Sequence, residues 1–164
     1  MCEYCGCQEI AVIADLTREH DEVVALISEV QRSIADQRRE DVAASCQKIS
    51  AILVPHTVVE EQGLFPEMAA EFPAHIEVLR SEHREIEKVL DEATGGGPDD
   101  PTWPERLSGA LHLLREHILK EQDGVFPAAL VALDPEQWER IEAVRARLGS
   151  ASPPLASATT TAPH

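Results

Sequence analysis

The chain is poor in aromatic residues, in basic residues and in long apolar runs, and each shortage argues against a class of protein. Aromatic side chains make up 4% of the sequence, and 14 Lys and Arg stand against 30 Asp and Glu, which gives a net charge of −16. Such a field repels nucleic acid and anionic membrane surfaces, so neither is expected as a partner. No run of about 18 apolar residues is present, which argues against a membrane-spanning helix.

Cysteine is also scarce, and its distribution is uneven. Cys2, Cys5 and Cys7 crowd into the first seven residues, and Cys46 stands alone. This spacing does not form the disulfide framework of a secreted domain. The N-terminus also lacks the basic region and apolar stretch of a secretory signal. A cytoplasmic location is therefore expected.

Helix-forming residues are abundant, and apolar residues recur at alternating steps of three and four, as on one face of a helix. The length of 164 residues suits one domain. The expected helices cover about Glu9–Gln37, Glu40–Gln62, Ala74–Ala93 and Thr102–Leu133. Pro55 is expected to bend the second helix, and Gly63 and Pro66 to loosen its end near Gln62. Thr102 is expected to cap the fourth helix, with Glu105 three residues on.

The composition divides the chain into four parts. Residues 1–8 form a Cys-rich segment, and residues 9–133 form the helical domain. Asp134 followed by Pro135 predicts the start of a short helix, which extends to residue 148. From residue 149 onward Ala, Ser, Pro and Thr dominate, so a flexible tail is expected at 149–164.

Two pairs of motifs are repeated along the helical part. The first is His56-x-x-x-Glu60 with Gly and Phe-Pro after it, and the same pattern recurs at His117-x-x-x-Glu121. The second is Leu-x-x-Glu-His, which ends at His20 and again at His83. The offsets between equivalent His residues are 63 and 61 positions. The pattern predicts an all-α, antiparallel, up-down four-helix bundle of two similar hairpins related by an internal pseudo-twofold axis.

A single His on an apolar helix face is usually a core residue held by a hydrogen bond. Four such His with two Glu in one layer differ, because a buried carboxylate is costly unless it is paired or bound to a metal. Imidazole and carboxylate ligands without thiolate suit iron, manganese or zinc. Six ligands exceed one tetrahedral zinc site and fit two ions about 3.5 to 4 Å apart. The candidate ligands are His20 and His56 for one ion, His83 and His117 for the other, and Glu60 and Glu121 as bridges.

The order of these four motifs resembles the hemerythrin-like, or HHE cation-binding, domains over about Ala11–Leu133. The Phe65-Pro66 and Phe126-Pro127 endings are similar to that family too. The resemblance implies a non-haem centre with two irons per chain, joined by an oxo or hydroxo bridge. It also implies binding or sensing of dioxygen, nitric oxide, peroxide or iron.

The sequence departs from the oxygen-carrying hemerythrins at two positions. Those proteins carry a His four residues after the third His, where this chain has Glu87, and an acid five residues after the last His, where this chain has Gln122. The second pattern resembles that of HHE-type iron and redox sensors, and the loss of the fifth His argues against reversible oxygen carriage. Glu87 is either a further ligand or a solvent-facing residue, and both readings stay open.

The remaining polar residues receive simpler interpretations. The Cys2, Cys5 and Cys7 run is either without function or a redox, metal-transfer or protein-partner site. Cys46 lies too far from the His layer to bind its ions. Phe65 and Phe126 are expected to cover one end of the site. Surface or tail positions are expected for His75, His112 and His164, and no ligand role is expected for Tyr4.

The sequence is compatible with three functions. The first is a binding or sensing protein with two irons and a small diatomic ligand or peroxide. The second is an enzyme that consumes peroxide or oxygen. The third is iron storage or repair of iron centres with help from the N-terminal thiols. Sequence alone leaves the question of enzymatic activity open.

Overall fold

The structure is a computed structural model and describes residues 10–149, in which helices joined by turns and loops are present and no strand is. The Cys-rich segment, Tyr4 and the tail from residue 150, with His164, lie outside the described residues. Helical segments follow one another in the order α1 Ala11–Ala35, α2 Arg39–Val59, η1 Glu60–Leu64, α3 Phe65–Met68, α4 Pro73–Asp91, α5 Trp103–Lys120, η2 Glu121–Val125, α6 Phe126–Ala132 and α7 Pro135–Leu148. The segments η1 and η2 are π-helical turns that continue the helices before them.

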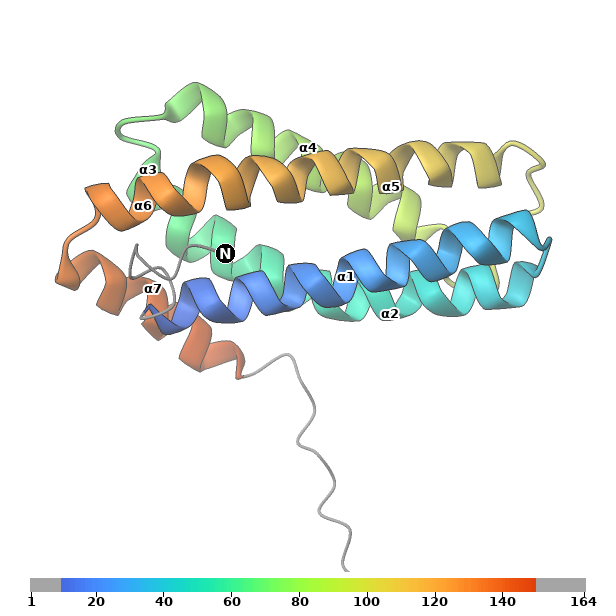
Figure 1. The fold of residues 1–164 in the computed structure, drawn as a ribbon, viewed down its shortest axis with the longest axis horizontal. Helices are drawn as coiled ribbons and strands as arrows, with labels where there is room; N and C mark the ends of the chain where they lie inside the picture. Colours follow the sequence, from blue (N-terminus) through green and yellow to red (C-terminus); the bar gives the residue numbers. More distant parts are fainter. Residues whose placement is uncertain (1–9, 150–164) are drawn as a thin grey trace, which may run out of the picture.

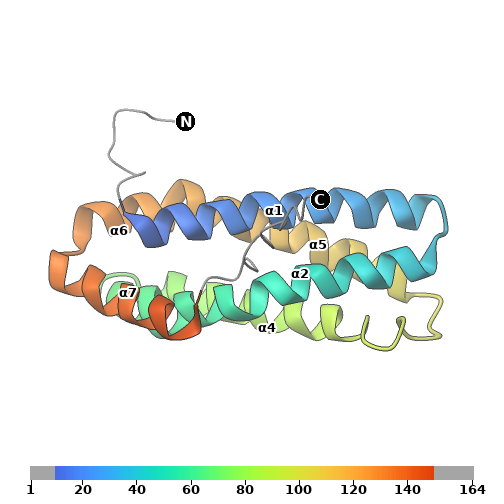
Figure 2. The same ribbon diagram turned by 90° about the horizontal axis from the view of Figure 1, so that it is seen from below.

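The long helices lie side by side as a bundle. Helix α1 packs along α2, α4 packs along α5, and further contacts join α2 to α4 and α1 to α5. Consecutive long helices run in opposite directions along the bundle (Figure 1). Helix α7 lies near the end that holds α3 and α6, and it contacts η1, α2 and α1 (Figure 2). The expected all-helical bundle is confirmed, whereas the exact twofold relation of the hairpins and the domain limits stay predictions.

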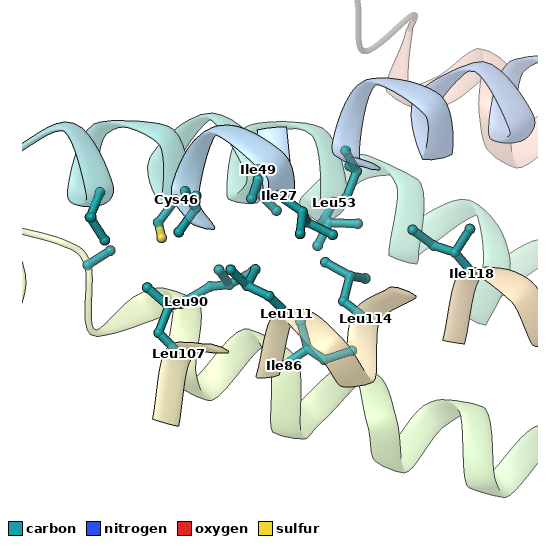
Figure 3. Packing of buried hydrophobic residues seen from close by; sticks show 14 of the residues in the cluster. Ile27, Cys46, Ile49, Leu53, Ile86, Leu90, Leu107, Leu111, Leu114 and Ile118 are labelled. Atoms are coloured by element: carbon teal, nitrogen blue, oxygen red, sulfur yellow. The ribbon is translucent and has the colours of Figure 1, made fainter. Parts of the chain in front are cut away.

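The core has two apolar clusters. The first includes Ile27, Cys46, Leu90, Trp103 and Leu111. Apolar side chains from the long helices point toward one another in this cluster (Figure 3). The second gathers residues from the start of α1, the Phe-Pro segments and α7. Its members include Phe65, Phe126 and Trp138. The spacing of three and four in the sequence therefore marks the buried stripes correctly.

The predicted end of the second helix was wrong. Gly63 and Pro66 do not stop it, because the chain passes through η1 and remains helical to Met68. Pro127 has the same position after η2. A proline removes one backbone hydrogen bond and crowds the carbonyl four residues earlier. The register shift of a π turn directly before each Phe-Pro pair accommodates both effects. Pro55, by contrast, lies within α2, as expected.

The two predicted helix starts have different outcomes. Asp134 accepts a hydrogen bond from the backbone of Gln137, whose side chain binds back to the backbone of Asp134, so this capping box is present. Thr102 makes no capping hydrogen bond. Its hydroxyl and its backbone N–H both bind Asp100 Oδ1 instead, at 2.7 and 2.8 Å. The predicted box with Glu105 was therefore wrong, because the preceding Asp competes for the Thr side chain.

One helical stretch among residues 10–149, Arg39–Met68, has the length and composition that would allow it to cross a membrane. Its mean hydropathy is 1.3 over the relevant window, and half of that window is buried in the bundle. The core helix of a soluble protein passes the same test. This stretch carries His56 and Glu60 into the protein interior, so it gives no clear membrane span.

Candidate metal centre

Six polar side chains meet in one layer of the bundle, between the two apolar clusters. They are His20 from α1, His56 from α2, Glu60 from η1, His83 from α4, His117 from α5 and Glu121 from η2, and none is more than 6% exposed. The structure thus brings together all six residues that the sequence singled out. They form two groups of four that could each hold a metal ion, with ligand atoms within 4.8 Å of one another. Glu60 and Glu121 belong to both groups.

Each of the two shared carboxylates lies between His residues of different groups. Glu60 Oε1 is 3.0 Å from Nε2 of His56, and Glu60 Oε2 is 3.2 Å from Nε2 of His83. Glu121 Oε1 is 2.9 Å from Nε2 of His117, and Glu121 Oε2 is 3.1 Å from Nε2 of His20. The i, i+4 spacing puts each Glu beside the His of its own helix. The bundle then brings the second His to its other oxygen.

Three further carboxylates, outside the six-residue layer, contact Nδ1 of three of the four imidazoles and orient them. Glu19 Oε2 lies 2.7 Å from Nδ1 of His56, and Glu82 Oε2 lies 2.8 Å from Nδ1 of His117. Glu61 Oε1 lies 2.8 Å from Nδ1 of His83. Nδ1 of His20 has no hydrogen-bond partner among residues 10–149. A carboxylate on Nδ1 fixes a neutral imidazole in the tautomer that leaves Nε2 free as a ligand.

Glu19 and Glu82 have no role predicted from the sequence, although both are part of the repeat. Each is the Glu of the Leu-x-x-Glu-His motif, directly before His20 or His83. Neighbouring positions on a helix point in different directions. Each Glu therefore turns away from the His that follows it and reaches the His of the neighbouring helix. Their burial, at 1% and 8% exposure, was the signal that the sequence alone did not show.

The donor atoms fit a pair of metal ions. Both oxygens of Glu60 and both oxygens of Glu121 are buried and have no aligned hydrogen bond within the described part of the chain. Their close contacts are with Nε2 atoms. Nε2 of His56 keeps its lone pair when Nδ1 donates to Glu19. This lone pair then faces the carboxylate oxygen of Glu60, which is also an acceptor. A cation between them removes the repulsion and satisfies the carboxylates.

In the metal-free layer, protons provide the positive charge. Burial alone lowers the pKa of His56, but the charge of Glu60 and the hydrogen bond with Glu19 outweigh it and raise the pKa to about 10. Burial likewise lowers the pKa of His117, and Glu121 raises it to about 9. Burial favours a raised pKa for Glu60, yet the charge of His56 holds that pKa well below its usual range. His56 and His117 are therefore protonated at neutral pH and carry positive charge beside the carboxylates of Glu60 and Glu121.

Aromatic rings close one side of the layer, as predicted. Phe126 stacks on His20 at a ring distance of 5.6 Å and an angle of 5°, and Phe65 stacks on His83 at 5.6 Å and 12°. Both Phe side chains are buried, at 3% and 0% exposure. These contacts restrict the imidazole rings and exclude water from that side.

A small cavity adjoins the layer on the opposite side. Its volume is about 10 Å³. The four His residues line it together with apolar side chains of the first core cluster, including Leu53, Ile86 and Leu114. Thr57 and Glu87 complete the lining. Glu87 belongs to neither group of four potential metal ligands. It lies beside the cavity, and burial raises the pKa of its carboxyl group.

The residues set aside by the sequence analysis lie away from this layer. His75 and His112 are exposed. Cys46 is buried in the first apolar cluster. The Cys2, Cys5 and Cys7 run lies outside the described residues, so its interpretation stays a prediction.

Comparison with known proteins places this geometry in a family. A protein from Nostoc sp. named "DNA nickase" is 25% identical over 130 residues, which cover 78% of this chain but only 36% of that protein. No solved structure matches the chain. The model of the Hemerythrin HHE cation binding domain matches residues 11–129, which contain all six residues of the layer. The chain therefore belongs to the hemerythrin HHE cation-binding family.

Proposed function

We propose that the protein binds two iron ions in the His/Glu layer and uses them to bind or sense a small ligand. The observation that carries this proposal is the position of Glu60 and Glu121, which are shared by two groups of potential ligands. His20 and His56 would hold one ion and His83 and His117 the other, with both Glu residues contacting both ions. The two sequence repeats would thereby supply one half-centre each.

The donor chemistry suits iron and argues against a closed structural zinc site. Mixed imidazole and carboxylate ligands without thiolate suit iron, manganese and zinc. Six protein ligands for two ions leave positions open for an external ligand, unlike a closed structural zinc site. When bound, the iron pair supplies redox chemistry and binding positions for oxygen-containing molecules. The protein contributes imidazoles in fixed orientations and an environment from which water is excluded.

The size of the adjoining cavity argues against a large ligand. A volume of about 10 Å³ approaches the roughly 10–15 Å³ that one water molecule requires. An organic substrate would need a much larger opening, and dioxygen, nitric oxide or peroxide would enter only with a small movement of the surrounding side chains. The mostly apolar wall of Leu53, Ile86 and Leu114 favours a neutral diatomic molecule.

A second candidate function is an enzyme that consumes peroxide, and Glu87 favours it. The carboxyl group lines the same cavity as the four His residues. It could supply a proton to a ligand held there, which turnover of peroxide requires. Catalytic loss of peroxide with the iron-loaded protein, absent in Glu87→Gln, would support this function over sensing.

The name of the Nostoc relative does not extend to this chain. The matching region is 36% of that protein, and the net charge of −16 opposes binding to DNA. We infer that the protein works without nucleic acid or membrane, in the cytoplasm. Any protein partner would use the N-terminal Cys2, Cys5 and Cys7 segment.

Metal analysis of protein purified in air tests the proposal. We expect about two irons per chain, as in a two-metal site, and a near-ultraviolet charge-transfer band that disappears on removal of iron. His20→Ala should weaken one ion more than the other. One zinc per chain without such a band would contradict the proposal.

A further inference from the structure

Helix α7 packs on one of the two π-helical turns of the centre and not on the other. Its Ile141 packs on Gly63 of η1 so closely that a Cβ at this Gly would lie 3.3 Å from Ile141 Cγ2. At Gly124, the equivalent position in η2, an added Cβ would meet nothing within 4 Å. Helix α7 therefore covers the turn that carries Glu60 and leaves the turn that carries Glu121 open.

A chain of polar contacts leads from α7 into the first half of the centre. The guanidinium of Arg145 binds both carboxylate oxygens of Glu19, with Nη1 at 3.3 Å from Oε2 and Nη2 on Oε1. Glu19 Oε2 in turn lies 2.7 Å from Nδ1 of His56. The side chains of Arg145 and Glu19 are 9% and 1% exposed. The whole chain from guanidinium to imidazole is thus shielded from water.

The carboxylate on His117, in the second half of the centre, takes its cation from outside α7. Glu82, which accepts from Nδ1 of His117, is paired with Lys120. Lys120 lies on α5, the same helix as His117, and its side chain is 48% exposed. The cation for Glu82 is therefore local and solvated, whereas the cation for Glu19 arrives from a helix 126 positions later in the chain.

This difference has a physical consequence. The planar fork of Arg holds a carboxylate in one orientation, which a single ammonium group does not do. Glu19 held in this way keeps the proton of His56 on Nδ1 and leaves Nε2 available to a metal. Removal of Arg145 leaves the buried carboxylate of Glu19 without its guanidinium, so the group that orients His56 is no longer held in place.

We propose that Arg145 is a positioning residue for the half-centre of His20 and His56, so that docking of α7 and metal binding at that half stabilise each other. The inference rests on the proposed two-ion function. It adds that the two halves are unequal and that a helix beyond the family match at 11–129 controls one of them. By thermodynamic reciprocity, metal in that half also tightens the docking of α7.

Anaerobic titration of the metal-free full-length chain with Fe(II), followed by calorimetry, tests this inequality. The wild type should bind two ions in separable steps. Arg145→Met should weaken one step by about 10- to 100-fold, the usual effect of losing an outer-shell partner, and leave the other step unchanged. Arg145→Lys should restore part of the loss. Arg140→Met is the matched control, because Arg140 lies on the same helix and pairs with Glu67 at the surface, away from the centre.

Two further measurements distinguish positioning from a general loss of structure. In a Glu19→Gln background, Arg145→Met should cause no additional weakening, since the carboxylate through which Arg145 acts is gone. Metal loading should slow amide hydrogen exchange in α7 of the wild type but not of Arg145→Met. If Arg145→Met alone does not fold, Arg145→Lys with and without Glu19→Gln answers the same question.

The outcomes separate this inference from the proposed function. A wild type that binds no metal overturns both. A wild type with two bound ions and an Arg145→Met variant with unchanged steps, or with both steps equally weakened, overturns the inference alone. A similar loss in Arg140→Met would also overturn it, because docking of α7 in general would then be responsible.

Discussion

Glu60 Oε2 lies 3.2 Å from Nε2 of His83, although the two residues belong to different repeats of the sequence. The other oxygen of Glu60 lies 3.0 Å from Nε2 of His56, in its own repeat. One carboxylate therefore touches both half-centres. We expect Glu60→Ala to lower the iron content from about two ions per chain towards none, because a shared ligand serves both ions. Inductively coupled plasma analysis of the purified variant measures this loss.

The controls for this prediction are exposed His residues that lie away from the layer. His75→Ala and His112→Ala should keep the full iron content, since both side chains are at the surface. Glu121→Ala should behave like Glu60→Ala, because Glu121 makes the equivalent contacts to His20 and His117. Full occupancy of both ions in either Glu variant would contradict the shared role.

Local patterns were sufficient to predict the helical elements and the six residues of the layer. The i, i+4 spacing of His56 and Glu60 needs only helical geometry, and the repeat supplied the other half. The roles of Glu19 and Glu82 were missed, because their partners lie on other helices, 37 and 35 positions away. The way the helices pack determines which Glu meets which His, and a repeated sequence motif does not specify that packing.

The contact of Arg145 with Glu19 was even less predictable from the sequence, because the two residues are 126 positions apart. In the sequence Arg145 is one of several Arg residues of a short helix, and its neighbour Arg147 is exposed. Only the docking of α7 on η1 and α1 turns Arg145 inward to Glu19. The end of the second helix was wrong for a related reason. Gly63 resembles a helix stop, but here the absence of a Cβ makes room for Ile141.

The metal-free protein should lose stability as the pH rises. The pKa of His56 is raised to about 10 and that of His117 to about 9, from 6.5. The folded state therefore binds more protons than the unfolded state between pH 6.5 and these values. The stabilisation is complete below pH 6.5 and is lost towards pH 9 and 10, with a slope of at most about 1.4 kcal/mol per pH unit for each group. Urea unfolding at several pH values measures the slope.

Iron should reverse this dependence. Metal binding requires the same imidazoles without their protons on Nε2, so protons are released and the affinity rises with pH over the same window. Loaded protein should accordingly resist the loss of stability that the metal-free protein shows. His112→Gln should change neither profile. Parallel profiles for the loaded and metal-free forms would mean that the ions bind away from His56 and His117.

The cavity predicts a selective effect of core truncation. Leu114 lines it and Leu111 does not, although both are buried on α5. Truncation of either residue to Ala should cost about 2 to 5 kcal/mol of stability, from lost burial and the space left behind. Only Leu114→Ala should speed the binding of nitric oxide to the loaded protein, because it widens the space beside the His residues. Stopped-flow absorbance compares the two variants. Equal rates in both would show that ligands reach the centre by another route.

The N-terminal thiols are expected to be separable from the centre. Deletion of residues 2–7 removes Cys2, Cys5 and Cys7 and leaves Cys46 as the sole cysteine. Cys46 is fully buried in the first apolar cluster, and burial raises its pKa to about 11. The truncated protein should therefore keep its iron and its helical signal, and it should show no reactive thiol in Ellman's assay until it is unfolded. One thiol per chain should then appear. Loss of iron or of folding on truncation would mean that the Cys segment supports the bundle, and rapid labelling of the folded truncated chain would mean that the first cluster opens readily around α2.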